Sequence, residues 1–139
     1  MIEFPGIRAL VGELGDLPTA VRANLRREFV GVGDAALASA RGNASWSSRI
    51  PGAISVRASA SQARSGVFLR VDASRAPHAR PYEGLSRGGS FRHPVYGTDR
   101  WVSQSVRPFL VPAVRAVRAD AIQAAEAAVA RACRAVRLT

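Results

Sequence analysis

Hydrophobic side chains recur every three or four residues along two long stretches of the chain, the first of which covers residues 16–42. This spacing predicts an amphipathic helix whose apolar stripe is Leu17, Val21, Leu25, Phe29, Val32, Ala36 and Ala40. Asp16 is a suitable N-cap and Gly42 a suitable C-cap. Gly31 and Gly33 each weaken the helix by about 1 kcal/mol relative to alanine, so a kink is possible there.

The second stretch with helical spacing begins near residue 108 and runs almost to the end of the chain. Pro112 suits the first turn of a helix. The apolar stripe comprises Val114, Val117, Ala121, Ile122, Ala125, Val129, Ala132 and Val136. Alanine favours helix, and its small side chain lets a neighbouring element approach closely. The single cysteine, Cys133, is expected to be a small buried residue of this long C-terminal helix.

Two shorter stretches, residues 53–60 and 66–73, alternate between apolar and polar residues with the two-residue period of a strand. The short connection between them, closed by a glycine, predicts a β-hairpin. One face of this hairpin is apolar and is formed by Ile54, Val56, Ala58, Val67, Leu69 and Val71. Arg57 and Arg70 lie on the other face, which is expected to be exposed to solvent.

Residues 91–97, FRHPVYG, are compatible with a third strand. Pro94 has no backbone N–H group, so this strand is expected at the edge of the sheet. The order is therefore helix, hairpin, irregular segment with a possible edge strand, and long helix. It predicts a single α+β domain over residues 1–139, with an N-terminal helix, a small antiparallel sheet built on a β-hairpin and a long C-terminal helix.

The charge of the chain points to acidic partners. It carries 20 basic residues, all of them arginine, against 10 acidic ones, which gives a net charge of +10. Such a balance makes a small basic DNA-binding protein an alternative function. The arginines are spread over the whole chain, however, and no run typical of a recognition helix is present.

Metal binding and catalysis have little support from residue spacing. His78 and His93 do not match a known ligand spacing, and a single cysteine excludes a cysteine-based zinc site. His78 with Glu83, or His93 with Asp99 and a serine, could be drawn as a triad, but no nucleophile elbow or phosphate loop accompanies them. We expect no cofactor and no enzymatic activity. The first residues lack the pattern of a signal peptide, and no apolar run is long enough for a membrane span. The protein is therefore expected to fold in a reducing cytoplasm.

Two short motifs, together with the order of the segments, point to a family. Residues 79–84, ARPYEG, resemble the turn that follows the central hairpin in small neck proteins of long-tailed phages. Residues 107–114, RPFLVPAV, resemble the Pro-Phe-Leu-x-Pro-Ala element that opens the last helix in these proteins. Residues 91–97 are similar to the segment between the two motifs. Over roughly residues 17–136, the chain thus resembles the neck, head–tail joining and tail-completion proteins of siphophages, often labelled minor tail components.

This resemblance implies a structural, non-enzymatic virion protein. Members of the family form rings between the portal-bearing head and the tail tube, so a homo-oligomeric ring, six-fold or twelve-fold, is expected. Its partners would be other copies of the chain and the neighbouring neck and tail proteins, after assembly in the cytoplasm of the host bacterium. Some arginines are expected to meet DNA in the lumen by sequence-independent contact.

The segment between the motifs is then expected to be a docking surface. Aromatic side chains give a large contact area, arginines pair with acidic neighbours, and Glu83 would receive an arginine from an adjacent subunit. The candidate interface residues are Arg80, Tyr82, Glu83, Phe91, Arg92, His93, Tyr96, Trp101 and Phe109. The alternative, in which Tyr82, Phe91 and Trp101 only cover the core of their own subunit, stays open.

Overall fold

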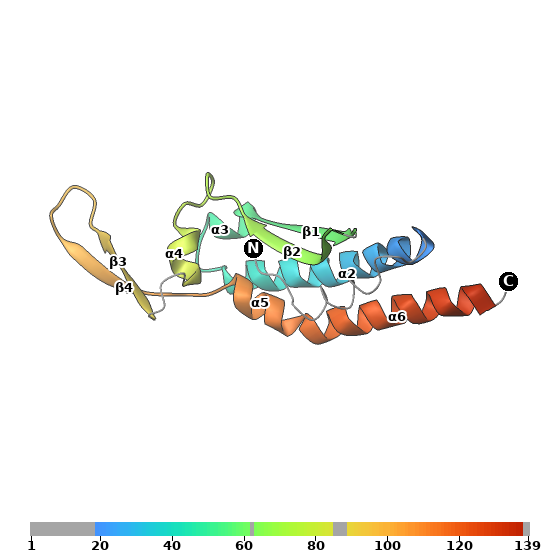
Figure 1. Cartoon of the computed structure of the whole chain (residues 1–139). Helices are drawn as coiled ribbons and strands as arrows, with labels where there is room; N and C mark the ends of the chain where they lie inside the picture. Colours follow the sequence, from blue (N-terminus) through green and yellow to red (C-terminus); the bar gives the residue numbers. More distant parts are fainter. Residues whose placement is uncertain (1–18, 62, 85–88, 138–139) are drawn as a thin grey trace.

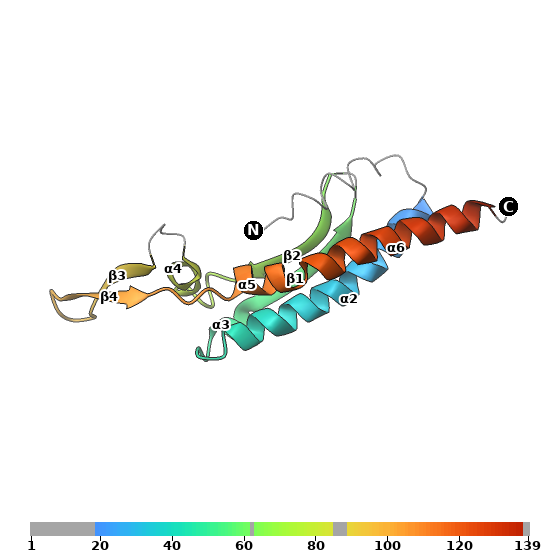
Figure 2. The same ribbon diagram turned by 90° about the horizontal axis from the view of Figure 1, so that it is seen from below.

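The computed structural model describes residues 19–61, 63–84 and 89–137. Two long helices run side by side, and a β-hairpin lies along one of them (Figures 1 and 2). The elements are α2 (Thr19–Asn43), α3 (Ile50–Ala53), β1 (Ile54–Ala60), β2 (Ser65–Val71), α4 (Ala79–Glu83), β3 (Ser90–Pro94), β4 (Trp101–Ser105), α5 (Leu110–Ala116) and α6 (Arg118–Arg137). The predicted α+β class and the order of its main elements are confirmed.

Helix α2 lies at the centre of the body and contacts the hairpin, α5 and α6. It confirms the first predicted helix, although Asp16, the expected N-cap, lies outside the described residues. The helix continues through Gly31 and Gly33 without interruption. The expected C-cap was wrong: Gly42 lies inside the helix and does not have the positive φ of such a cap.

Gly33 lies at a close contact between α2 and the hairpin. A Cβ atom at this position would lie 3.1 Å from Cγ2 of Val56 and 3.3 Å from Cγ1 of Val67. Gly31, two positions earlier, has no such neighbour within 4 Å. The glycine at position 33 therefore serves packing between layers and not a kink in the helix.

Leucine at these two glycines should have opposite effects on stability. Gly31→Leu should raise the free energy of unfolding by about 0.5–1 kcal/mol, because glycine disfavours an exposed helix. Gly33→Leu should lower it by about 1–3 kcal/mol, because the added side chain overpacks the contact with Val56 and Val67. Urea unfolding of the two variants measures both effects. Equal shifts of the two midpoints would contradict this account of the α2–hairpin contact.

The β1–β2 hairpin has the predicted antiparallel pairing, from Ile54 opposite Val71 to Ala60 opposite Ser65. Its apolar face packs on α2, as expected from the alternation. The other face is not wholly exposed to solvent, because the side chain of Phe68 is only 9% exposed. The guanidinium of Arg64 lies over the Phe68 ring, 5.2 Å from its centre. The alternation thus predicts the two strands and their apolar face correctly but not the burial of Phe68.

The apolar interior forms two clusters along α2. One surrounds Ile50 and Phe109, which are fully buried. The other surrounds Leu25 and Phe29 and is closed by three buried alanines of α6, which are Ala121, Ala125 and Ala128. These small side chains let α6 lie close to α2, as the sequence predicts.

The C-terminal helical stretch differs from the prediction in two respects. It is two helices, because the backbone at Val117 (φ −96°, ψ 3°) departs from helical values between α5 and α6. Cys133 is exposed, so its expected burial was wrong. The physical reason is its helical position: it lies five residues after Ala128, off the stripe that faces α2.

The third strand does not join the hairpin on α2. Within the described residues, β3 pairs antiparallel with β4, from Ser90 opposite Ser105 to Pro94 opposite Trp101. The expectation of an edge strand on the main sheet was therefore wrong. Strand β4 supplies the partner, and Pro94 ends β3 beside the turn. We call residues 90–105 the arm.

Candidate functional site: the arm and its root

The arm projects from one end of the body, away from the hairpin and the long helices (Figures 1 and 2). Exposed and half-buried residues alternate along both of its strands, and none of its residues is fully buried. An isolated two-stranded hairpin is marginally stable in water. The arm must therefore be held by contacts where it meets the body. We call this region the root; it comprises Trp46, His78, residues 82–84, Gly89 and residues 106–107.

Aromatic rings connect the body to the arm through the root. The ring of Tyr82 lies 4.6 Å from that of Trp46 and 5.1 Å from that of Phe91, between ring centres. The guanidinium of Arg107 lies 5.4 Å from the centre of the Trp46 ring. Each such aromatic pair contributes roughly 0.5–1.5 kcal/mol beyond the area that it buries. Tyr82, between the loop after α2 and the first strand of the arm, is the central member of this series.

The two histidines lie at the ends of this series and not together. His78 contacts Tyr82 edge-on, with 6.2 Å between ring centres. His93 lies 5.9 Å from Phe91, and its Nε2 is 3.0 Å from Oε1 of Gln104 across the arm. Within the described part of the chain, no group of three His, Cys, Asp or Glu side chains is placed to hold a metal ion. The histidines are thus parts of the packed root and the arm.

Backbone hydrogen bonds also fix the root. The N–H of Arg107 donates to the carbonyl oxygen of Tyr82 at 2.8 Å, and the N–H of Val106 donates to that of Gly89 at 3.0 Å. Gly84 ends α4 with a left-handed backbone (φ 87°), a conformation that favours glycine. The chain is therefore held both where it enters the arm and where it leaves it.

Glu83 joins the root to the start of α5. Its carboxylate accepts hydrogen bonds from three backbone N–H groups: Phe109 at 2.9 Å, Leu110 at 3.0 Å and Val111 at 2.7 Å. The first N–H groups of a helix have no partner within the helix, and they favour negative charge. Glu83 therefore caps α5 from a distant position in the sequence. The Glu83 carboxylate was expected to pair with an arginine of a neighbouring copy. In the structure it accepts hydrogen bonds from three backbone N–H groups of its own chain.

Phe109 is fully buried and belongs to the core cluster around Ile50. Its carbonyl oxygen accepts a hydrogen bond from Nδ2 of Asn43 at 3.2 Å, which ties the end of α2 to the start of α5. The sequence placed Phe109 among the interface candidates. The structure places it inside the body, so it does not present a surface to a partner.

The other candidates divide between the surface and the root. Four are exposed: Arg80 on α4, and Arg92, Tyr96 and Trp101 on the arm. Tyr82, Glu83, Phe91 and His93 are half-buried. Tyr96, which is 102% exposed, lies in the turn at the tip, and Trp101, which is 57% exposed, begins β4 beside it. The arm therefore carries two large aromatic side chains to its far end.

Two residues of the root and arm were not expected from sequence. The guanidinium of Arg107 lies over the ring of Trp46. The side chain of Gln104 forms a hydrogen bond with the ring of His93. Residues 101–105 are two apolar residues followed by three polar ones, so no alternation of residue types indicated the strand that carries Gln104. Trp46 packs against Tyr82 and the core of its own chain.

Among the described residues, no helix is both long enough and apolar enough to cross a membrane. Comparison with family models, curated proteins and solved structures finds no match for this chain.

Proposed function

We propose that this protein is a structural virion subunit that forms a homo-oligomeric ring at the head–tail junction of a tailed phage, where it joins head to tail or completes the tail. The observation that carries the proposal is the arm, which holds Tyr96 and Trp101 away from the body. Large aromatic side chains in exposed positions mark surfaces that bind other proteins. No catalytic step and no cofactor enter this role.

The physical link between the two motifs also supports the proposal. ARPYEG supplies Tyr82 and Glu83, and RPFLVPAV supplies the backbone N–H groups that Glu83 binds. Two segments that carry the resemblance to siphophage neck proteins are thus parts of one root. Their residue types are explained by the need to hold the arm in a fixed direction.

A ring follows from the way in which an arm docks. The arm of one copy would contact a different surface on the body of the next copy, which is a heterologous contact. Such contacts produce a closed ring when the rotation between neighbours closes, and six or twelve copies are the numbers that the resemblance implies. The remaining surfaces of the ring would meet neighbouring neck and tail proteins in the virion.

Removal of the two aromatic side chains at the tip should prevent joining. We expect Tyr96→Ala/Trp101→Ala to leave the free energy of unfolding within about 0.5 kcal/mol of the original, because both side chains are exposed. Electron microscopy of a phage lysate carrying this variant should show filled heads separate from tails, as in a lysate that lacks the protein.

The control is Val30→Ala, which changes an exposed apolar side chain of α2 far from the arm. Particles with this variant should be joined normally. Joined particles with the tip variant would rule out the arm as the docking element. Joined particles in a lysate that lacks the protein altogether would overturn the neck role itself.

A further inference from the structure

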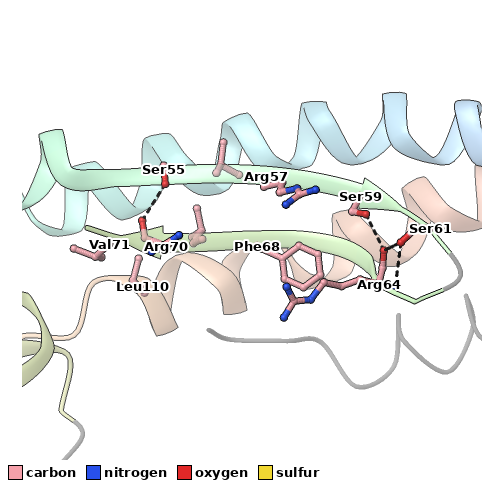
Figure 3. A pocket seen from close by; sticks show the side chains of 11 residues that line it. Ser55, Arg57, Ser59, Ser61, Arg64, Phe68, Arg70, Val71 and Leu110 are labelled. Carbon is pink, nitrogen blue, oxygen red and sulfur yellow. Dashed lines mark hydrogen bonds between the residues drawn. The ribbon is translucent and has the colours of Figure 1, made fainter. Parts of the chain in front are cut away.

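A hollow of about 750 Å³ lies over the β1–β2 hairpin (Figure 3). Three arginines and three serines line it: Arg57, Arg64, Arg70, Ser55, Ser59 and Ser61. No carboxylate is among its lining residues in the described part of the chain. The hollow thus collects positive charge on the face of the hairpin opposite to α2, and we call this face the arginine face.

The pairing of the strands brings two of these arginines close together. Arg57 lies opposite Phe68, and Arg70 is two residues further along β2. Such diagonal neighbours on one face of an antiparallel pair are roughly 7–8 Å apart. Like charges at this separation repel each other unless a counter-charge is present.

The described part of the chain does not supply that counter-charge. Within the described residues, neither Arg57 nor Arg70 forms an ion pair. Asp72, the nearest acidic residue along β2, is used elsewhere: it accepts hydrogen bonds from the hydroxyl of Ser74 at 2.6 Å and from its N–H at 2.9 Å. These bonds lower the pKa of Asp72 and hold its carboxylate in the turn after β2. Among residues 19–61, 63–84 and 89–137, no counter-charge faces either guanidinium group, so both keep donors for an anion.

The neighbouring side chains decide which kind of anion fits. The hydroxyls of Ser59 and Ser61 both donate to the carbonyl oxygen of Arg64 at 2.8 Å, so they already have an acceptor. Phe68 is buried below Arg64 and offers no free ring on which a base could stack. Stacking on aromatic rings is a main source of affinity for single strands. The face therefore suits phosphate groups that follow one another along a backbone.

We infer that the arginine face binds the phosphodiester backbone of double-stranded DNA through Arg57 and Arg70, without reading its sequence. Guanidinium groups form bidentate hydrogen bonds with phosphate. The net charge of +10 adds a long-range attraction that brings DNA to this face. The inference does not depend on the neck role, since it concerns a different surface from the arm.

The salt dependence of DNA affinity tests this inference. The full chain would be titrated with a fluorescein-labelled DNA duplex at several salt concentrations, and anisotropy would give the affinity at each. Arg57→Gln/Arg70→Gln should reduce the slope of log affinity against log salt by roughly 1.8, because each lost phosphate contact removes about 0.9. Arg57→Lys/Arg70→Lys should keep the slope, since lysine still neutralises a phosphate.

The matched control is Arg26→Gln/Arg27→Gln, which removes the same two charges from exposed positions on α2. Its slope should equal that of the original protein. An unchanged slope in the Arg57/Arg70 glutamine variant would overturn the inference, as would an equal loss in the control or no measurable binding near physiological salt. Thermal unfolding checks the fold: the Arg57/Arg70 glutamine variant should melt at the original temperature or higher, because a repulsion is removed.

Discussion

Phe109→Ala should lower the free energy of unfolding by about 3–5 kcal/mol, the usual cost of removing a buried phenylalanine ring from a core. Phe109 is fully buried in the cluster that also holds Ile50, at the junction of α2 and α5. Its removal leaves a cavity that the fixed backbone of α5 cannot fill, because Glu83 and Asn43 hold that segment on both sides. Urea unfolding followed by circular dichroism measures the change.

Val30→Ala is the appropriate comparison for this effect. Val30 is 46% exposed on α2, so its truncation should change the free energy of unfolding by less than about 0.5 kcal/mol. If Phe109→Ala were as mild as this control, Phe109 would not be a core residue. Its assignment to a docking surface, made from the sequence, would then regain support.

Glu83→Ala should lower the free energy of unfolding by about 2–4 kcal/mol. The substitution removes charge-assisted hydrogen bonds, each worth about 1.5–3 kcal/mol, from half-buried N–H groups that then depend on water. The loss of a helix cap alone is worth about 0.5–2 kcal/mol, so the expected value lies above it. Beyond stability, amide hydrogens of Leu110 and Val111 should exchange faster with solvent, since Glu83 is the acceptor of both.

Two further variants separate the capping role from the charge alone. Glu83→Gln keeps one acceptor oxygen and should lose less stability than Glu83→Ala. Glu126→Ala removes a carboxylate from an exposed position on α6 and should be close to neutral. Faster exchange at Leu110 and Val111 should appear only in the Glu83 variants. Normal exchange there in Glu83→Ala would show that the cap is not formed in solution.

Periodicity predicted the main elements of the body, but not the break at Val117 or the burial of Phe68. The stripe along α2, the alternation in β1 and β2 and the alanine-rich face of α6 each produce the element and the buried face that the pattern indicates. These elements could be predicted because burial of one face is decided by local spacing. Cys133 was wrongly expected to be buried, because adjacent residues of a helix point in different directions and a buried position can be followed by an exposed one.

The root and the arm could be predicted only in part. Tyr82, Glu83 and Phe91 were selected correctly as residues of one region, but their partners lie far away in the sequence. Glu83 binds N–H groups 26 to 28 residues later, and no spacing rule indicates such a contact. Strand β4 was missed because Trp101–Ser105 is short and its residue types do not alternate between apolar and polar, and β3 was therefore assigned to the wrong sheet.

The separation of the arm from the body has a consequence for how the sequence can vary. None of the arm residues is fully buried, whereas the root and the two core clusters hold the contacts that determine stability. Exposed positions such as Arg92, Tyr96 and Ser103 can therefore change with little effect on folding. New partners could be accommodated by substitutions in the arm while the body stays the same. Under the proposed docking role of the arm, partner choice and folding stability can thus diverge independently.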